Sequence, residues 1–335
     1  MPFIEDILKY KSLSIVGLEK NTGKTECLNY VLRRLKDRNV KIALTSIGID
    51  GESVDQVKNT HKPEIELQEG TLFVTSEKHY HEKHIVSEVM DVSEQRTSLG
   101  RLITARAMGT GKVLISGPAD TSWIKTIIKD MESYNVDTTI IDGALSRLSL
   151  GSPAVAQSIV LATGAALSCN IPQLVRKTKF VYDLINIEEY KTSIKDELLN
   201  TNKGIWAIDA DGILHDLDIP SVFLLEKNKD KLFTHGPVLY VTGAISDKLL
   251  NFLRIQKNVK DIVLIVKDFT KIFVTPQAYS AYLKRGGTVK VLMSTNLIAV
   301  TVNPVSPSGY VLDSLTLRNA MSEALQIPVY DIKKL

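Results

Sequence analysis

The stretch Ser14-Ile-Val-Gly17-Leu-Glu-Lys-Asn-Thr-Gly23-Lys24-Thr25 decides the fold. It overlaps the apolar, β-branched run at residues 13–16 and opens a segment, residues 25–36, whose Leu and Val residues recur at helical spacing. A glycine-rich loop between a buried strand and an amphipathic helix is typical of phosphate binding, because backbone N–H groups and the helix N-terminus point at phosphate oxygens. The stretch therefore predicts a site for a nucleoside triphosphate, ATP or GTP.

Each residue type in this loop has a task. Lys24 carries a mobile charge for the β and γ phosphates, and Thr25 offers its hydroxyl to Mg²⁺. Five residues separate Gly17 from Gly23, one more than in the standard phosphate loop. We expect nucleotide contacts from the loop and the first helical turn, namely Gly17, Glu19, Lys20, Asn21, Thr22, Gly23, Lys24, Thr25 and Glu26.

Two carboxylates follow predicted strands and could complete a magnesium site. Asp142 ends the apolar run at residues 138–141 and precedes Gly143, as in a Walker B strand, although an ordinary Asp-Gly turn also explains it. Asp50 follows a second strand, in Gly48-Ile-Asp-Gly51. Mg²⁺ prefers hard oxygen ligands. We therefore expect Lys24, Asp50 and Asp142 to act in catalysis, and Thr25, Asp50 and Asp142 to hold Mg²⁺.

Other polar residues have a structural explanation of at least equal weight. Asp120 is a third candidate for the magnesium site, but it begins a predicted helix, where an aspartate normally serves as the N-cap. Arg147 could reach phosphates or simply lie on the surface. The segment His79-Tyr-His-Glu-Lys-His84 offers three imidazoles, but its polarity favours a solvated loop over a zinc site. Cys27 is expected to be a small packed residue rather than a nucleophile.

Apolar runs alternate with helical patterns along the chain, which predicts an α/β fold with a mostly parallel sheet. We place a P-loop nucleotide-binding domain at residues 1–200 and a second α/β domain at residues 201–335. The boundary falls in the charged segment at residues 188–203.

Several strands are predicted outside the phosphate loop. Residues 71–75 and 99–107 are expected at an edge of the first sheet. Residues 113–116, ending at Gly117, are expected to form one of its parallel strands. Residues 297–302 are expected to form a strand of the second domain.

Composition excludes several classes of protein. Among 335 residues, 41 Lys and Arg oppose 38 Asp and Glu, so the net charge of +3 gives no bulk attraction to nucleic acid or membranes. Two cysteines cannot build a disulfide framework. Residues 1–11 lack the pattern of a secretion signal, and the apolar residues 158–168 are shorter than the roughly 20 that span a bilayer. We expect a cytoplasmic protein with neither nucleic-acid nor membrane partners.

Four segments together resemble one family. They are Gly17-Leu-Glu-Lys-Asn-Thr-Gly-Lys-Thr-Glu26, Thr45-Ser-Ile-Gly-Ile-Asp-Gly-Glu52, Ile140-Ile-Asp-Gly-Ala-Leu-Ser-Arg147 and Leu161-Ala-Thr-Gly-Ala165. The chain resembles the NTP-binding subunit of the lysine 5,6-aminomutase reactivase of amino-acid-fermenting bacteria, most densely over residues 12–185. The resemblance implies a chaperone-like subunit that works with a second, MutS-like subunit. Together they would use Mg²⁺-dependent ATP or GTP hydrolysis to reactivate an adenosylcobalamin-dependent lysine 5,6-aminomutase.

The loop alone also resembles that of dethiobiotin synthetases and related dimeric P-loop NTPases. That resemblance implies a homodimer and places Asn303, before Pro304, at the adenine edge, although a turn-forming Asn-Pro explains the pair equally well. Some members of this class carry an intersubunit lysine where this chain has Glu19, and the neighbouring Lys20 could compensate.

Two other functions fit the same loop. A ligase or kinase similar to dethiobiotin synthetase would use ATP to phosphorylate a small carboxylate or carbamate. A regulatory module would bind the nucleotide without hydrolysing it. ATP turnover that requires a small acid indicates the ligase or kinase, and turnover that requires a protein indicates the reactivase. A bound triphosphate that persists after long incubation indicates the regulatory module.

Overall fold

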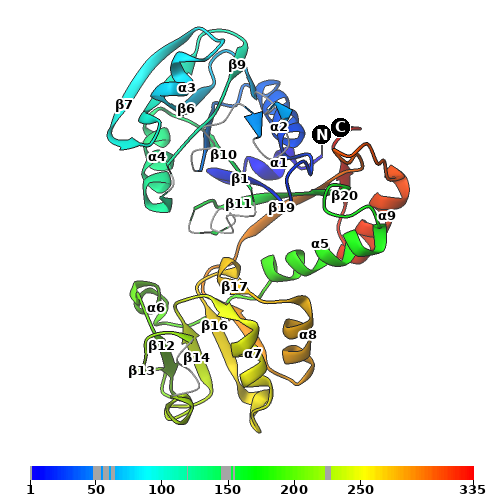
Figure 1. Cartoon of the computed structure of the whole chain (residues 1–335). Coiled ribbons are helices and arrows are strands. Elements are labelled where there is room, and N and C mark those ends of the chain that lie inside the picture. Colours follow the sequence, from blue (N-terminus) through cyan, green and yellow to red (C-terminus); the bar gives the residue numbers. More distant parts are fainter. Residues whose placement is uncertain are drawn as a thin grey trace. The chain divides into compact units, whose positions relative to one another are not determined.

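The computed structural model describes residues 2–47, 54–55, 60–61, 65–118, 120–144, 152–153, 155–222 and 228–335. The chain divides into two compact units, Met1–Lys179 with Asn296–Leu335, and Phe180–Thr295 (Figure 1). This division differs from the predicted boundary at residue 200. The C-terminal segment returns to the first unit because its two strands complete the first sheet.

The first unit is built on a nine-stranded sheet in the order β20-β19-β11-β1-β10-β2-β6-β8-β7. Neighbouring strands are parallel from β20 through β6, and β8 and β7 are antiparallel to their neighbours. This confirms the predicted α/β class with a mostly parallel sheet. The strands are β1 (Ser12–Gly17), β2 (Ile42–Ser46), β6 (Leu72–Ser76), β7 (Ser87–Thr97), β8 (Gly100–Ala107), β10 (Thr138–Ala144), β11 (Ser158–Gly164), β19 (Asn296–Asn303) and β20 (Val329–Asp331).

The main core of this unit lies between β1 and the helix that follows it. All six residues of β1 are buried, and Leu13 and Ile15 share a cluster with Leu28 and Val31 of α2. Burial of each such side chain contributes about 1.5–3 kcal/mol. The helices are α1 (Ile4–Ile7), α2 (Lys24–Lys36), α3 (Glu77–His81), α4 (Thr121–Ser133), α9 (Ser314–Leu325) and α5 (Ile171–Ile185), which spans the boundary between the units.

The strands predicted at residues 71–75 and 99–107 lie at the sheet edge, as β6 and β8. The outermost strand, β7, was not predicted, because its residues are mostly polar and are exposed or half-buried. The strand predicted at residues 113–116 is wrong. Only β9 (Gly111–Val113) forms there, and it pairs with β5 (Ile65–Leu67) outside the large sheet. A further small pair joins β3 (Val54–Asp55) to β4 (Thr60–His61).

The second unit contains a five-stranded mixed sheet in the order β13-β12-β14-β16-β18. β12 is antiparallel to both its neighbours, whereas β14, β16 and β18 are parallel. A second α/β sheet domain is therefore confirmed, but the strand predicted at residues 297–302 is β19 of the first sheet. The elements are β12 (Ile205–Ile208), β13 (Leu214–Ile219), β14 (Val238–Val241), β15 (Ile245–Ser246), β16 (Val263–Val266), β17 (Ile272–Phe273), β18 (Thr288–Val291), α6 (Lys195–Asn200), α7 (Asp247–Arg254) and α8 (Pro276–Lys284).

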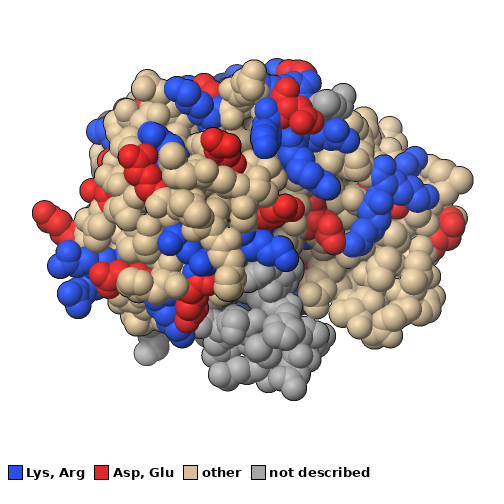
Figure 2. All heavy atoms as spheres, turned by 90° about the horizontal axis from the view of Figure 1, so that it is seen from above, with Lys and Arg blue, Asp and Glu red and all other residues tan. Residues whose placement is uncertain are grey.

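The described surface is polar and mixed in charge. On the face shown in Figure 2, Lys and Arg side chains are interspersed with Asp and Glu. Across the described ranges, the helices are too short or too polar to cross a bilayer.

Candidate functional site

The glycine loop emerges from the middle of the large sheet. β1, which leads into it, pairs in parallel with β10 on one side and with β11 on the other. Since β10 and β11 follow each other in the chain but flank β1, the strand order changes direction here. Such a reversal opens a crevice at the carboxyl ends of parallel strands, where α/β proteins bind ligands. Gly17, the last residue of β1, lies at that end.

The loop is folded compactly on itself. Asn21 and Gly23 adopt left-handed backbone conformations, with φ of 62° and 89°, which glycine and asparagine tolerate best. The Thr22 hydroxyl donates to the Glu19 carbonyl at 2.8 Å, and the Lys20 N–H donates to the Glu19 carboxylate at 3.0 Å. A Cβ atom on Gly17 would lie 2.8 Å from the Thr22 hydroxyl oxygen. The tight curl therefore depends on glycine at position 17.

Helix α2 begins at Lys24 with an N-terminus suited to an anion. Its N-cap is Gly23, which has no side chain to accept a hydrogen bond from the first amides. The first N–H groups of a helix lack intrahelical acceptors, and the helix dipole adds partial positive charge there. The N–H groups of Lys24, Thr25 and Glu26 are therefore available to hold phosphate oxygens.

The structure brings Lys24 and Asp142 together. The Lys24 Nζ lies 2.8 Å from Asp142 Oδ1, and the two side chains are 24% and 13% exposed. This contact is an ion pair without hydrogen-bond geometry, so among the described residues the buried Oδ1 keeps unused accepting capacity. The neighbouring strand β2 helps to hold the Asp142 backbone in place, since the Ser46 hydroxyl donates to the Asp142 carbonyl at 3.1 Å. The two most specific candidates thus meet at the carboxyl ends of adjacent strands.

These residues suit a magnesium ion better than a transition metal. No cluster of three His, Cys, Asp or Glu side chains able to hold a metal occurs in the described ranges. Mg²⁺ needs no such cluster, because one or two protein oxygens, phosphate oxygens and water complete its shell. Asp142, through its carboxylate oxygens, and the half-buried Thr25, next to Lys24, could supply those protein oxygens.

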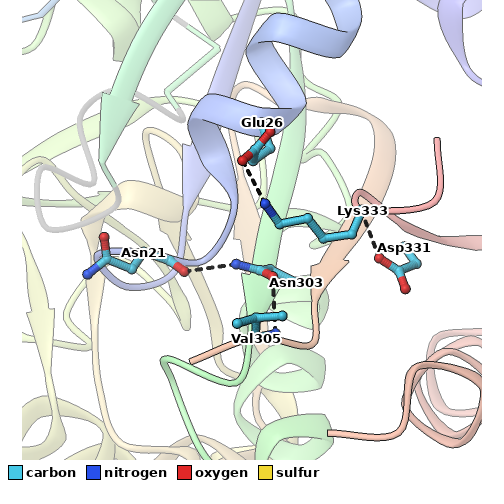
Figure 3. Close-up of polar contacts among 6 residues, drawn as sticks. All are labelled: Asn21, Glu26, Asn303, Val305, Asp331 and Lys333. Carbon is cyan, nitrogen blue, oxygen red and sulfur yellow. Dashed lines mark hydrogen bonds and ion pairs between the residues drawn. The ribbon is translucent and has the colours of Figure 1, made fainter. Parts of the chain in front are cut away.

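On the other side of β1, the end of β19 contacts the loop (Figure 3). Asn303 Nδ2 donates to the Asn21 carbonyl at 3.3 Å, and Asn303 Oδ1 accepts from the Val305 N–H at 3.1 Å. A Cβ atom on Gly23 would lie 2.9 Å from Asn303 Cβ. Asn303 therefore contacts the loop, and its amide also forms the turn that the Asn-Pro pair suggested. Its role at the adenine edge stays a prediction.

A lysine that sequence reasoning missed also reaches α2. Lys333, just beyond β20, forms an ion pair with Glu26 at 2.6 Å between Nζ and Oε1 (Figure 3). The two residues lie at opposite ends of the chain, and no motif surrounds Lys333. Only the pairing of β20 with β19, which is a tertiary feature, brings them together.

The other candidates either serve another role or lie outside the described structure. Asp50 and Arg147 fall outside the described residues. Asp120 is the N-cap of α4, as expected, and accepts from the Ser122 N–H at 2.8 Å. Hydrogen bonds from the Ser122 N–H and hydroxyl lower the pKa of Asp120 below its ordinary value. Among the loop residues, Glu19 and Lys20 are exposed.

The predicted solvated histidine loop is confirmed only in part. Helix α3 ends within this segment, at His81, and His79 is buried, with its Nδ1 3.1 Å from the Ser116 hydroxyl. His81 and His84 are exposed, so the three imidazoles do not share one environment. Cys27 is buried as expected, and desolvation raises the pKa of its thiol to about 12.

Comparisons with known proteins identify no family. No protein-family model matches the chain, and no curated protein matches it.

Proposed function

We propose that this chain is a P-loop NTPase that binds ATP or GTP with Mg²⁺ and hydrolyses it. The observation that carries the proposal is the contact between Lys24 and Asp142 beside the uncapped start of α2. A lysine, an acid and helix N-terminal amides at the same end of the sheet are groups that bind phosphates and Mg²⁺ in phosphoryl transfer.

Each residue has a defined role in this proposal. The loop amides and Lys24 hold the phosphates, and Thr25 and Asp142 hold Mg²⁺ directly or through water. Magnesium would supply charge neutralisation on the phosphate oxygens. Lys24 must exchange Asp142 for the phosphates when nucleotide binds, which frees the Asp142 carboxylate. Before the nucleotide binds, the ion pair therefore keeps the Lys24 and Asp142 side chains beside the position proposed for the phosphates.

The first test measures nucleotide binding and phosphate release by the full-length chain, with and without Mg²⁺. We expect Lys24→Ala to weaken triphosphate binding about ten-fold or more and to reduce hydrolysis by about 100-fold, the usual cost of removing a group that stabilises the transition state. Lys36→Ala, in the last turn of the same helix, is the matched control and should change neither. Unchanged affinity and turnover in Lys24→Ala would contradict the proposal.

For the biological role, we propose a chaperone-like reactivase subunit, by resemblance to the lysine 5,6-aminomutase reactivase. Hydrolysis would change the loops at the carboxyl ends of the strands, and a MutS-like subunit and the mutase would respond to that change. The same turnover assay tests this role. Stimulation by the mutase and the second subunit supports it, whereas stimulation by a small carboxylate supports a ligase. A triphosphate that stays bound and intact indicates a regulatory module.

A further inference from the structure

The two sides of the phosphate loop carry different contacts. On the β10 side, Lys24 meets Asp142. On the side of β19 and β20, Asn303 meets Asn21, and Lys333 meets Glu26 (Figure 3). The β10 side has the lysine and the acid needed for phosphoryl transfer. The contact between Glu26 and Lys333 has no part in that chemistry.

Glu26 places a negative charge at the N-terminus of α2, where the nucleotide phosphates are proposed to bind. It is the third residue of α2, within the first turn, and its side chain is 51% exposed. A carboxylate there interacts favourably with the helix dipole, as a phosphate would. The two anions compete for the same positive end and repel each other. A nucleotide would therefore bind more weakly beside a Glu26 whose charge is not balanced.

Lys333 is held in place to balance that charge. The Lys333 N–H donates to Asp331 Oδ1 at 2.8 Å, and Asp331, at the end of β20, is 2% exposed. The Ile332 N–H donates to the Val302 carbonyl at 3.1 Å, which ties the segment to β19. A Cβ atom on Gly23 would lie 3.1 Å from Ile332 Cγ2, so the same segment also contacts the loop. The backbone beneath the lysine is therefore fixed, unlike that of a lysine on a loose tail.

We infer that Lys333 is a positioning residue of the nucleotide site, which acts by neutralising Glu26 beside the bound phosphates. This inference rests on the proposed function and extends it, because it makes the C-terminal end of the chain part of the site. Lys333 acts through Glu26 and has no role in phosphoryl transfer. Its loss should weaken nucleotide binding, and the removal of the Glu26 charge should restore it.

The test is a double-mutant cycle on the full-length chain, with triphosphate affinity, KM and kcat as readouts. Lys333→Ala should weaken binding about two- to five-fold, which is the size of effect expected from an exposed ion pair, with kcat little changed. Glu26→Gln combined with Lys333→Ala should recover the wild-type affinity. Lys333→Arg should bind as the wild type does. The defect of Lys333→Ala should shrink at high salt, because salt screens exposed charges.

Lys334→Ala is the matched control, since it removes the same charge from the next residue, which is also exposed. A Lys333→Ala variant that binds no more weakly than Lys334→Ala would overturn the inference. A double variant as weak as Lys333→Ala would overturn it too, because Lys333 would then act other than through Glu26. In both cases nucleotide binding by the wild type, and its loss in Lys24→Ala, would leave the proposed function standing. A wild type that binds no nucleotide would contradict the proposed function itself.

Discussion

Both sheets carry an aspartate at or just beyond the carboxyl end of a parallel strand, and the two aspartates do different work. Asp142 of β10 faces Lys24. Asp268, after β16, is 1% exposed, and its Oδ1 accepts from the N–H and the hydroxyl of Thr270. It thereby caps the short 3₁₀ helix Phe269–Lys271. An acid at a strand end is available for chemistry only where local backbone groups do not already occupy it.

The two sheets also differ in the order of their parallel strands. In the second unit the parallel strands β14, β16 and β18 follow one another in a single direction. In the first unit β10 and β11 lie on opposite sides of β1, and parallel sheets generally bind ligands at such a reversal. The first sheet therefore has its available acid next to the position where α/β sheets generally bind ligands.

The largest effect should come from replacing each of these two aspartates by alanine. Asp142→Ala should reduce Mg²⁺-dependent hydrolysis about 100-fold or more, because it removes an oxygen expected to hold the metal. Asp268→Ala should leave hydrolysis unchanged. It should lower the free energy of unfolding of the second unit by about 1–3 kcal/mol, since buried donors on Thr270 lose their acceptor.

Phosphate-release assays and denaturant unfolding measure the two quantities on both variants. The comparison fails if Asp268→Ala impairs hydrolysis as strongly as Asp142→Ala does. It also fails if Asp142→Ala keeps full turnover.

A second, smaller contrast concerns glycines that follow a central strand of each sheet. Gly23→Ala should lower the free energy of unfolding by about 1–3 kcal/mol and weaken nucleotide binding, because the new Cβ meets Asn303 and Ile332 at a positive φ. Gly243, after β14, has no atom within 4 Å of a Cβ position. Gly243→Ala should change stability by less than about 0.5 kcal/mol.

Thermal unfolding and triphosphate titration of the two variants measure this difference. Equal losses in both would mean that the packing of β19 and the C-terminal segment on the loop contributes nothing.

The sequence could predict the β10 side of the site but not the side formed by β19 and β20. Lys24 and Asp142 each carry a local signature, a glycine loop and an apolar run followed by Asp-Gly, so sequence patterns suffice. Lys333 has no such signature, because its role depends on β20 pairing with β19 in the first sheet. The apolar run at residues 297–302 predicts a strand, but its sequence does not show which of the two sheets the strand joins. For Asn303, only resemblance to another family suggested a role.

The smallest expected effect concerns a third strand-end acid, Asp209, directly after β12. Its Oδ1 accepts from the N–H groups of Asp211 and Ile213, and its Oδ2 lies 2.7 Å from His215 Nε2. The hydrogen bond from His215, followed by that from the Ile213 N–H, lowers the pKa of Asp209 below its ordinary value of 3.8. A lowered folded-state pKa means that the carboxylate stabilises the fold above about pH 4, and that this stability is lost as the pH falls through the folded pKa.

Asp209→Asn should therefore melt slightly below the wild type at pH 6, and the gap should close as the pH approaches 2. Thermal midpoints across that range measure it, with Asp211→Asn, an exposed neighbour, as the control that should leave the wild-type profile unchanged. A gap that stays constant with pH would mean that the charge on Asp209 does not stabilise the fold. In that case hydrogen bonding alone would set the role of this acid. Asp209 would then differ from Asp142 in that only Asp142, which forms an ion pair with Lys24, depends on its charge.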